Sequence, residues 1–170
     1  MSINSVQLYA KGLLDGLPLP VAMGGPAGAG GDVLTALVTP PVVDYRTTPR
    51  AYIWGSTGYE DASTMPSPSS FKKVTHKLDI WITCFASIND FAGQDSVFPS
   101  VLEAVMQKLR STPKPVEGLL DTETGRTSDL LNFGQHLTWD YAPVRAVEEG
   151  SDIARFDGRI TVKFEEWLHA

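Results

Sequence analysis

The sequence predicts an α+β fold in which an antiparallel or mixed sheet carries two helices packed on one face. Two segments repeat apolar residues with the period of a helix, and the segment 71–85 alternates with the period of a strand. Strand-rich stretches fill most of the remaining chain. Each helix has one apolar stripe that needs an apolar sheet face to cover. A single domain over residues 1–170 therefore satisfies all of the stripes.

The first helix is predicted over residues 4–17. Its apolar residues recur on one helical face: Val6, Tyr9, Ala10, Leu13, Leu14 and Leu17. Asn4 and Gln7 are spaced as in a capping box, where each side chain satisfies a backbone amide at the helix start. Gly16 and Pro18 are predicted to end the helix.

The second helix is predicted over residues 96–110, with Asp95 or Ser96 as its cap. Its apolar stripe is unbroken: Val97, Phe98, Val101, Leu102, Val105, Met106 and Leu109. Pro99 is tolerated because the amides of the first turn have no intrahelical partner.

The clearest strand is 71–85, in which one face is apolar and the other is polar. The apolar set includes one histidine: Val74, His76, Leu78, Ile80, Ile82 and Cys84. Shorter strands are predicted at 33–39, 42–46 and 50–54, and strand texture returns from Leu130 to Val147 and from residue 153 to Trp167.

Prolines and glycines predict where these strands bend or end. Pro40 and Pro41 cannot donate to a central ladder, so the region around them is expected at an edge or a bend. The pair Asp157-Gly158 is a turn or bulge signal inside the last strand.

Mobile loops are predicted at about residues 22–32, 56–70 and 112–128, and 56–70 reads as one long hairpin loop. The glycine-rich stretch 24–31 is followed by Asp32 and Val33. A phosphate loop requires Lys and then Ser or Thr at that place, so a flexible loop is the better interpretation.

Composition argues against several classes of function. The net charge of -6 and the sequence pI near 5.0 disfavour specific binding to nucleic-acid phosphates. The N-terminus resembles no signal peptide, and no apolar run is long enough for a membrane span. The single cysteine, Cys84, excludes an internal disulfide and a multi-cysteine metal site.

No catalytic, cofactor-binding or metal-binding constellation is predicted. His76, His136 and His169 are far apart in sequence and lack ligand spacing to any His, Cys or carboxylate. The stretch Gly55-Ser56-Thr57-Gly58 does not have the spacing of a nucleophile elbow. We therefore do not expect an enzyme, although an enzyme or small-ligand protein with a pocket beneath the second helix stays an alternative.

Contact surfaces are the better-supported prediction. Trp81, Phe85 and Trp167 fall on the faces opposite the apolar alternation of their strands, and Met65 is an apolar point in the 56–70 loop. Aromatic residues concentrate in subunit interfaces, so these four are the predicted interface residues. The alternative is that a loop or the N-terminal segment covers the tryptophans.

The order of elements resembles the tail terminator (tail completion) proteins of long-tailed bacteriophages. The resemblance rests on the N-terminal helix, the hairpin with its Pro/Ser-rich loop, the strand 75–83, the helix 97–109 and the terminal strand 159–164. It covers most of the chain as a likeness of layout. The glycine-rich insert at 24–31 and the segment 112–128 are longer than the minimal pattern.

The resemblance implies a homo-oligomeric, hexameric ring that caps the finished tail tube and joins it to the head-tail connector or stopper protein. Such a subunit would be assembled in the host cytoplasm and reside at the head-proximal end of the tail in the virion, with DNA passing through the ring lumen. A head-completion or neck adaptor protein shares the small α+β build and differs in its docking partner. No cofactor and no membrane partner are implied.

Overall fold

The computed structural model describes residues 3–23, 31–38, 49–61, 71–87, 91–121, 124–125, 127–141, 145–146 and 152–169. The predicted α+β class with a mixed sheet is confirmed. The described elements, in chain order, are α1 (Ile3–Leu14), β1 (Leu17–Met23), β2 (Gly31–Leu37), β3 (Arg50–Asp61), β4 (Phe71–Ser87), α2 (Phe91–Arg110), β5 (Val116–Leu120), β6 (Thr127–Tyr141), β7 (Arg145–Ala146) and β8 (Ile153–His169).

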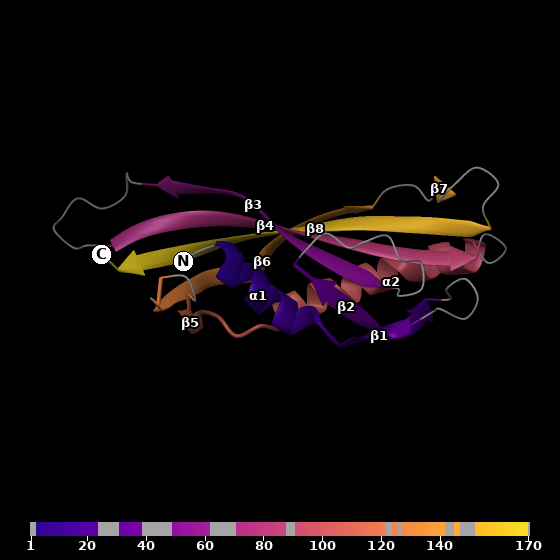
Figure 1. Cartoon of the computed structure of the whole chain (residues 1–170), viewed down its shortest axis with the longest axis horizontal. Coiled ribbons are helices and arrows are strands. Elements are labelled where there is room, and N and C mark those ends of the chain that lie inside the picture. Colours follow the sequence, from indigo (N-terminus) through magenta and orange to yellow (C-terminus); the bar gives the residue numbers. More distant parts are fainter. Residues whose placement is uncertain are drawn as a thin grey trace.

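The strands follow the order β1-β2-β3-β4-β8-β6-β5, and β7 pairs with the first part of β8. β2 and β3 are parallel, whereas the other pairs are antiparallel. β4 and β8 pair along their whole length, from Phe71 opposite His169 to Ser87 opposite Ile153. These two strands run along the long axis of an elongated molecule (Figure 1).

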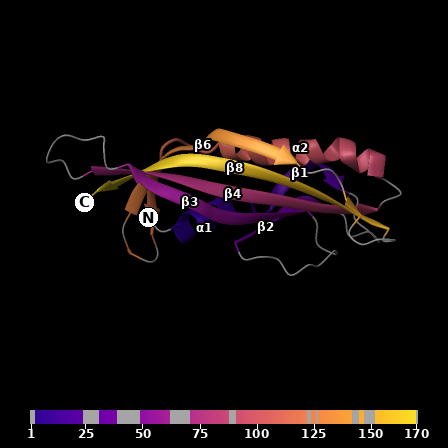
Figure 2. The ribbon, with the colours of Figure 1, turned by 90° about the horizontal axis from the view of Figure 1, so that it is seen from above.

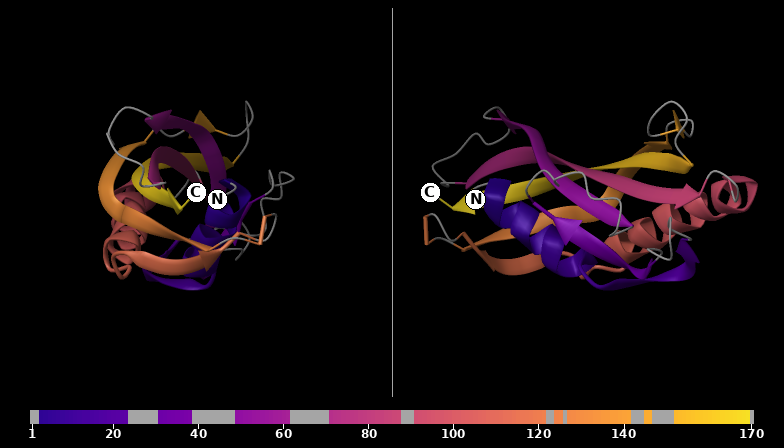
Figure 3. Two further views of the ribbon diagram at one scale, coloured as in Figure 1. Left: turned by 90° about the vertical axis from the view of Figure 1, so that its left-hand side faces the viewer. Right: turned by 45° about the vertical axis from the view of Figure 1, so that its right-hand side comes forward.

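Strict alternation along β4 and β8 divides the sheet into an inner and an outer face. The even-numbered residues face inward and are buried: Val74, His76, Leu78, Ile80, Ile82 and Cys84 on β4, and Ala154, Phe156, Ile160, Val162, Phe164 and Glu166 on β8. Most of these apolar residues join one core cluster with residues of both helices, including Val6, Ala10 and Leu14 of α1 and Val101, Val105 and Leu109 of α2. Figures 2 and 3 show α1 and α2 beside these strands and the β1–β2 hairpin near α2.

Aromatic contacts connect the helices to the strands. The Tyr9 ring of α1 meets Phe133 of β6 edge-on with centroids 5.6 Å apart, and Phe133 lies 5.3 Å from Phe164 of β8. On α2, Phe98 lies 5.7 Å from Phe156. Aromatic pairs at these separations contribute about 1 kcal/mol each beyond their buried area.

Both helices exist, and α2 ends at Arg110 as predicted, but α1 ends earlier and α2 begins earlier than predicted. α1 ends at Leu14 instead of 17, and Gly16 follows it with a φ of 76°, a left-handed conformation that glycine adopts without strain. Leu17 consequently begins β1. α2 begins at Phe91, before the predicted caps Asp95 and Ser96. Within the added turn, Gly93 has low helix propensity, but Ala92 and Gln94 are good helix formers.

Parts of all three predicted loops are strand. The loop at 22–32 overlaps the end of β1 and the start of β2, the loop at 56–70 overlaps β3 up to Asp61, and the loop at 112–128 contains β5 and the start of β6. The segments 24–30, 39–48 and 62–70 lie outside the described residues, and with them the strand predicted at 42–46 and the middle of the predicted hairpin loop.

The region around Pro40 and Pro41 was predicted at an edge or a bend; residues 39–48 lie outside the described residues, so this stays a prediction. The strand before them, β2, lies between β1 and β3. The edge belongs to β1, whose Pro18 and Pro20 lack an amide proton to donate. Asp157-Gly158 is no turn, since both residues pair with β4 in the middle of β8. A Cβ on Gly158 would lie 2.6 Å from Leu102 Cδ2, so the glycine permits close packing of α2.

Candidate functional site

The outer face of the sheet forms the candidate site, and it is built from regular rows of side chains across four strands. Register places Tyr52, Trp81, Arg159 and Asp140 in one row, and Trp54, Asp79, Thr161 and Thr138 in the next. A third row contains Lys77, Lys163 and His136. Directly opposed residues in a sheet have Cβ atoms about 5 Å apart, so these rows form one continuous surface.

An aromatic patch occupies the β3–β4 side of this face and consists of Tyr52, Trp54 and Trp81. Trp54 is 54% exposed and Trp81 is 39% exposed, whereas their strand neighbours Ile53 and Ile82 are fully buried. Trp54 and Trp81 are diagonal neighbours in the register, close enough for large aromatic rings to form one surface. Neighbouring exposed tryptophans on a sheet face are more typical of a protein contact surface than of a surface that stays in water.

Beside the patch, Asp79 is held by a dense set of hydrogen bonds. Arg159 donates from Nη2 to Asp79 Oδ2 at 2.8 Å, and the Thr161 hydroxyl donates to Oδ1 at 2.6 Å. The Asp79 side chain is buried although it lies on the outer face. The hydrogen bond and the charge of Asp79 raise the pKa of Arg159 against a smaller opposing effect of burial. Asp79 and Arg159 are therefore a rigid ion pair at the centre of the face.

The same guanidinium connects the ion pair to the aromatic patch. Arg159 Cζ lies 5.5 Å from the centroid of the Trp81 ring, within the range of a cation–π contact. Because Arg159 is fixed by Asp79, it holds the Trp81 ring in one orientation. The patch thus presents a preorganised tryptophan, which lowers the entropy that binding would otherwise cost.

A shallow polar groove lies on the β6 side of the face and has a volume of about 320 Å³. Its lining is mostly charged or hydroxylic: Lys77, Thr138, Trp139, Asp140, Arg159, Thr161 and Lys163. The groove and the aromatic patch share the strand β4, so one partner could contact both.

The structure describes the side chains of two of the four predicted interface residues, Trp81 and Phe85. Trp81 is part of the aromatic patch. Phe85 lies on the same side of β4 as Trp81 by alternation. Its side chain is only 5% exposed, so it is buried and offers little surface to a partner. Trp167 lies in β8 opposite Lys73 and Asp129, and its side chain lies outside the described part of the chain. Met65 is also outside the described residues.

Sequence reasoning missed Tyr52 and Trp54, although the signal was present. In the segment 50–54, Ala51 and Ile53 alternate with Tyr52 and Trp54, which is the strand period of two. The run was too short to decide which set faced inward. The antiparallel register with β4 decides it, because Tyr52 lies opposite Trp81.

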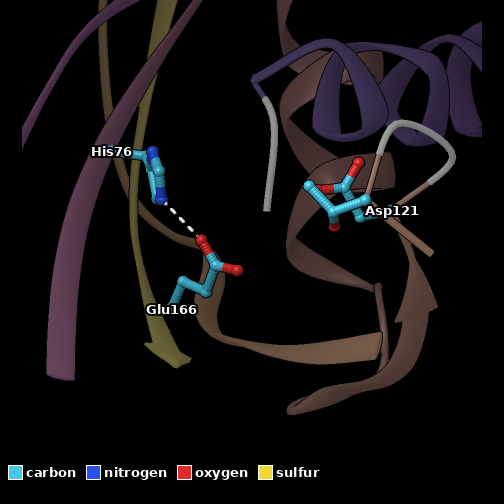
Figure 4. A network of polar contacts seen from close by, with 4 residues as sticks. His76, Asp121 and Glu166 are labelled. Atoms are coloured by element: carbon cyan, nitrogen blue, oxygen red, sulfur yellow. Dashed lines mark hydrogen bonds and ion pairs between the residues drawn. The ribbon is translucent and has the colours of Figure 1, made fainter. Parts of the chain in front are cut away.

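A second polar cluster is buried on the inner face and serves the fold. His76 Nε2 lies 2.8 Å from Glu166 Oε2 (Figure 4). The His76 ring also stacks on Phe164. Burial raises the pKa of Glu166, but hydrogen bonding, first of all from His76, together with nearby positive charge outweighs burial, and the net pKa lies below the ordinary value. Nearby, the buried Ser5 hydroxyl donates to Asp121 Oδ1 at 3.1 Å, which connects α1 to the end of β5. His76 is thus a buried histidine bonded to a neighbour.

Reactive chemistry is sparse in the described residues. No group of three or more His, Cys, Asp and Glu side chains among them is arranged to hold a metal ion. Burial and, to a smaller extent, the charge of Asp157 raise the pKa of Cys84, which keeps this thiol protonated and unreactive. None of the described helices is long and apolar enough to cross a membrane.

A larger groove, of about 690 Å³, lies between β1 and α2. Its lining is mainly aliphatic and polar: Leu17, Pro18, Leu19, Ser100, Glu103, Ala104, Gln107, Lys108 and Ser111. Ligand sites usually combine an apolar pocket with a few convergent polar groups. The ionisable side chains in this lining are Glu103 and Lys108.

Comparison of the chain with protein-family models and with curated proteins found no match.

Proposed function

We propose that this chain is a structural subunit that assembles with copies of itself into a ring, and that the ring is the tail terminator of a long-tailed bacteriophage. The ring would cap the tail tube, stop its growth and offer a docking surface to the head-tail connector. The mechanism is steric, and no catalysed reaction is proposed. Both helices would cover the inner face and leave the outer face for contacts.

The exposed aromatic patch is the observation that carries self-assembly. Tryptophan and tyrosine dominate the binding energy of protein interfaces when they lie at the centre of the contact. Trp54 and Trp81 are exposed on the sheet in the single subunit, and Trp81 is held in place by Arg159. Burying both side chains in a contact would remove this apolar surface from water.

The edges of the sheet favour assembly through faces over strand addition. β1 is an edge strand with two prolines, and β5 is a short edge strand with a register shift around Gly118, whose φ is 64°. Prolines, bulges and short length are devices that prevent an edge from pairing with another chain. A contact between copies is therefore better formed by the side chains of the outer face than by pairing at a strand edge.

The order of elements supports the more specific assignment to a tail terminator. The described chain keeps the N-terminal helix, the antiparallel β3–β4 pair, the long second helix and the terminal strand that carry the resemblance. A neck adaptor is distinguished by its partner. A ring that binds the ends of tail tubes is a terminator, and one that binds only filled heads is an adaptor.

The test of assembly is Trp54→Ala, alone and combined with Trp81→Ala. We expect the double variant to raise the concentration for half-assembly by about 100-fold, as expected for loss of central aromatic contacts. Sedimentation velocity measures the assembly, and negative-stain microscopy shows whether rings form and whether they cap tail tubes.

Tyr141→Ala is the matched control for that test. Tyr141 is 59% exposed, but it lies opposite Gly158 in register and so belongs to the other face. Assembly of this variant should stay within about threefold of the wild type, as for most residues outside a hot spot. If Trp54→Ala/Trp81→Ala assembles as tightly as the control, the outer face is not the subunit interface.

A further inference from the structure

A row of basic side chains crosses the outer face next to the aromatic patch. Lys77 of β4 lies directly opposite Lys163 of β8, and Lys163 lies directly opposite His136 of β6. Like charges directly opposite each other in a sheet are destabilising. The subunit therefore carries an electrostatic cost at this row, which we call the basic row (Lys77, Lys163 and His136).

Two carboxylates close to the basic row, Asp79 and Asp140, are engaged by other groups. Asp79, one row away, is engaged by Arg159 and by the Thr161 hydroxyl. Asp140 lies opposite Arg159, and its charge contributes to the raised pKa of that guanidinium. The ion pairs found in the described part of the chain use His76, Arg110, Arg155 and Arg159, and none of them uses Lys77 or Lys163.

The two lysines converge on the polar groove of about 320 Å³. Ammonium groups, a guanidinium and threonine hydroxyls surround it, a set of donors that suits an anionic oxygen group. The groove is large enough for a side-chain carboxylate and a few atoms of its chain.

We propose that the groove between Lys77 and Lys163 is a carboxylate-binding site, and that its occupant is an acidic side chain of a second copy of this chain. The choice of occupant follows from charge. The chain has 20 acidic and 14 basic residues, so two copies repel each other unless a locally basic surface receives acidic groups. The basic row adjoins the aromatic patch, which gives the usual arrangement of an apolar contact with a charged margin.

The inference rests on the proposed self-assembly and adds its specificity. The aromatic patch would supply most of the affinity, whereas the basic row would set the orientation and the rate of association, because charged margins act mainly on these. A nucleic-acid phosphate is a weaker candidate for the same groove. The basic row is short, and the protein around it is acidic overall.

The test is Lys77→Gln/Lys163→Gln, with Lys108→Gln/Lys114→Gln as the matched control. Both double variants remove two positive charges. Lys108 and Lys114 lie away from the basic row: Lys108 lines the larger groove between β1 and α2, and Lys114 is exposed after the end of α2. We expect the first variant to raise the concentration for half-assembly by about tenfold or more, and the control to change it by less than about threefold.

Two further readouts separate a role in binding from a role in folding. Added salt should weaken assembly of the wild type and of the control, and should weaken that of Lys77→Gln/Lys163→Gln much less, because its main charge contact is gone. The urea midpoint of the Lys77→Gln/Lys163→Gln subunit should equal or exceed that of the wild type, since the repulsion between Lys77 and Lys163 is relieved.

The possible failures are distinguishable. A wild-type protein that stays monomeric at high concentration overturns both the ring and this site. Rings that form equally well in both double variants overturn the carboxylate site alone. If rings persist in Lys77→Gln/Lys163→Gln but no longer cap tail tubes, the occupant belongs to a different protein, and the assignment to a second copy is wrong.

Discussion

The inner and outer faces of β3, β4 and β8 are made by alternate residues of the same strands, yet the two faces differ in how far their side chains are buried and paired. On the inner face, Ile53, Leu78, Ile80 and Ile82 have no exposed surface, and the buried His76 imidazole is hydrogen-bonded to Glu166. The stability of the subunit depends on this face.

On the outer face, only the central polar groups are paired with one another. Asp79 accepts hydrogen bonds from Arg159 and from Thr161. Beside them, Trp54 is exposed, and Lys77 lies opposite Lys163. A binding partner can lower the free energy of such groups, by covering the exposed aromatic ring or by placing a negative charge between the two lysines. If the proposed assembly is right, stability depends on the inner face and assembly on the outer face of one sheet, and substitutions of neighbouring residues test this separation.

The largest expected effect comes from adjacent residues of β3 that face opposite ways. Ile53→Ala removes a fully buried side chain and should lower the free energy of unfolding by about 3–4 kcal/mol, because it leaves a cavity in the core. Trp54→Ala should lower it by less than about 1 kcal/mol, since much of that side chain is already in water. Urea denaturation of the two subunits measures both values. Similar losses in the two variants would mean that Trp54 serves the fold, and the separation of the faces would fail.

A second prediction concerns the buried pair of the inner face and its pH dependence. Glu166→Gln should cost about 2 kcal/mol at pH 7, since a charge-assisted hydrogen bond to His76 is lost. The folded-state pKa of Glu166 is below its ordinary value of 4.5, so the ionised carboxylate stabilises the fold above that value. This stabilisation is lost as the pH falls through the folded-state pKa.

The measurement is the difference in urea midpoint between wild type and Glu166→Gln from pH 7 to pH 3. The difference should be full above about pH 5 and should shrink in the acid range. Glu117→Gln, at an exposed position of β5, is the control and should stay within about 0.5 kcal/mol at every pH. A difference that grows toward acid would contradict a lowered pKa for Glu166.

The long periodic elements were predictable because each has enough residues to establish its period. The strand at 71–85 and the stripe from Val97 to Leu109 were both found, and the even-numbered residues of β4 were correctly placed in the core. The missed strands have a physical reason in common. β1 contains prolines and β5 contains Gly118, which read as turn signals and are tolerated because both strands lie at sheet edges.

The candidate site was only partly predictable, because its rows exist across strands and not along them. Trp81 could be placed on the outward side of its own strand from the alternation alone. The neighbours Trp54, Arg159 and Lys163 come from strands far away in sequence, and only the register brings them beside Trp81 and Lys77. Phe85 shows the converse. Its parity is outward, but it is buried, which alternation within one strand cannot reveal.

The smallest expected effect tests how tightly the inner face is packed, and it uses two glycines with opposite expected signs. Gly158→Ala should lower the free energy of unfolding by about 1.5 kcal/mol, because the added Cβ would lie 2.6 Å from Leu102 Cδ2 and 3.2 Å from the Phe98 ring. Gly12→Ala should raise it by about 0.5–1 kcal/mol, because that helical position of α1 has no atom within 4 Å of the new Cβ and alanine is the better helix former. Thermal or urea unfolding of the two variants checks the pair. If Gly158→Ala is as stable as the wild type, Leu102 and Phe98 can move away, and the inner face is looser than its buried surface indicates.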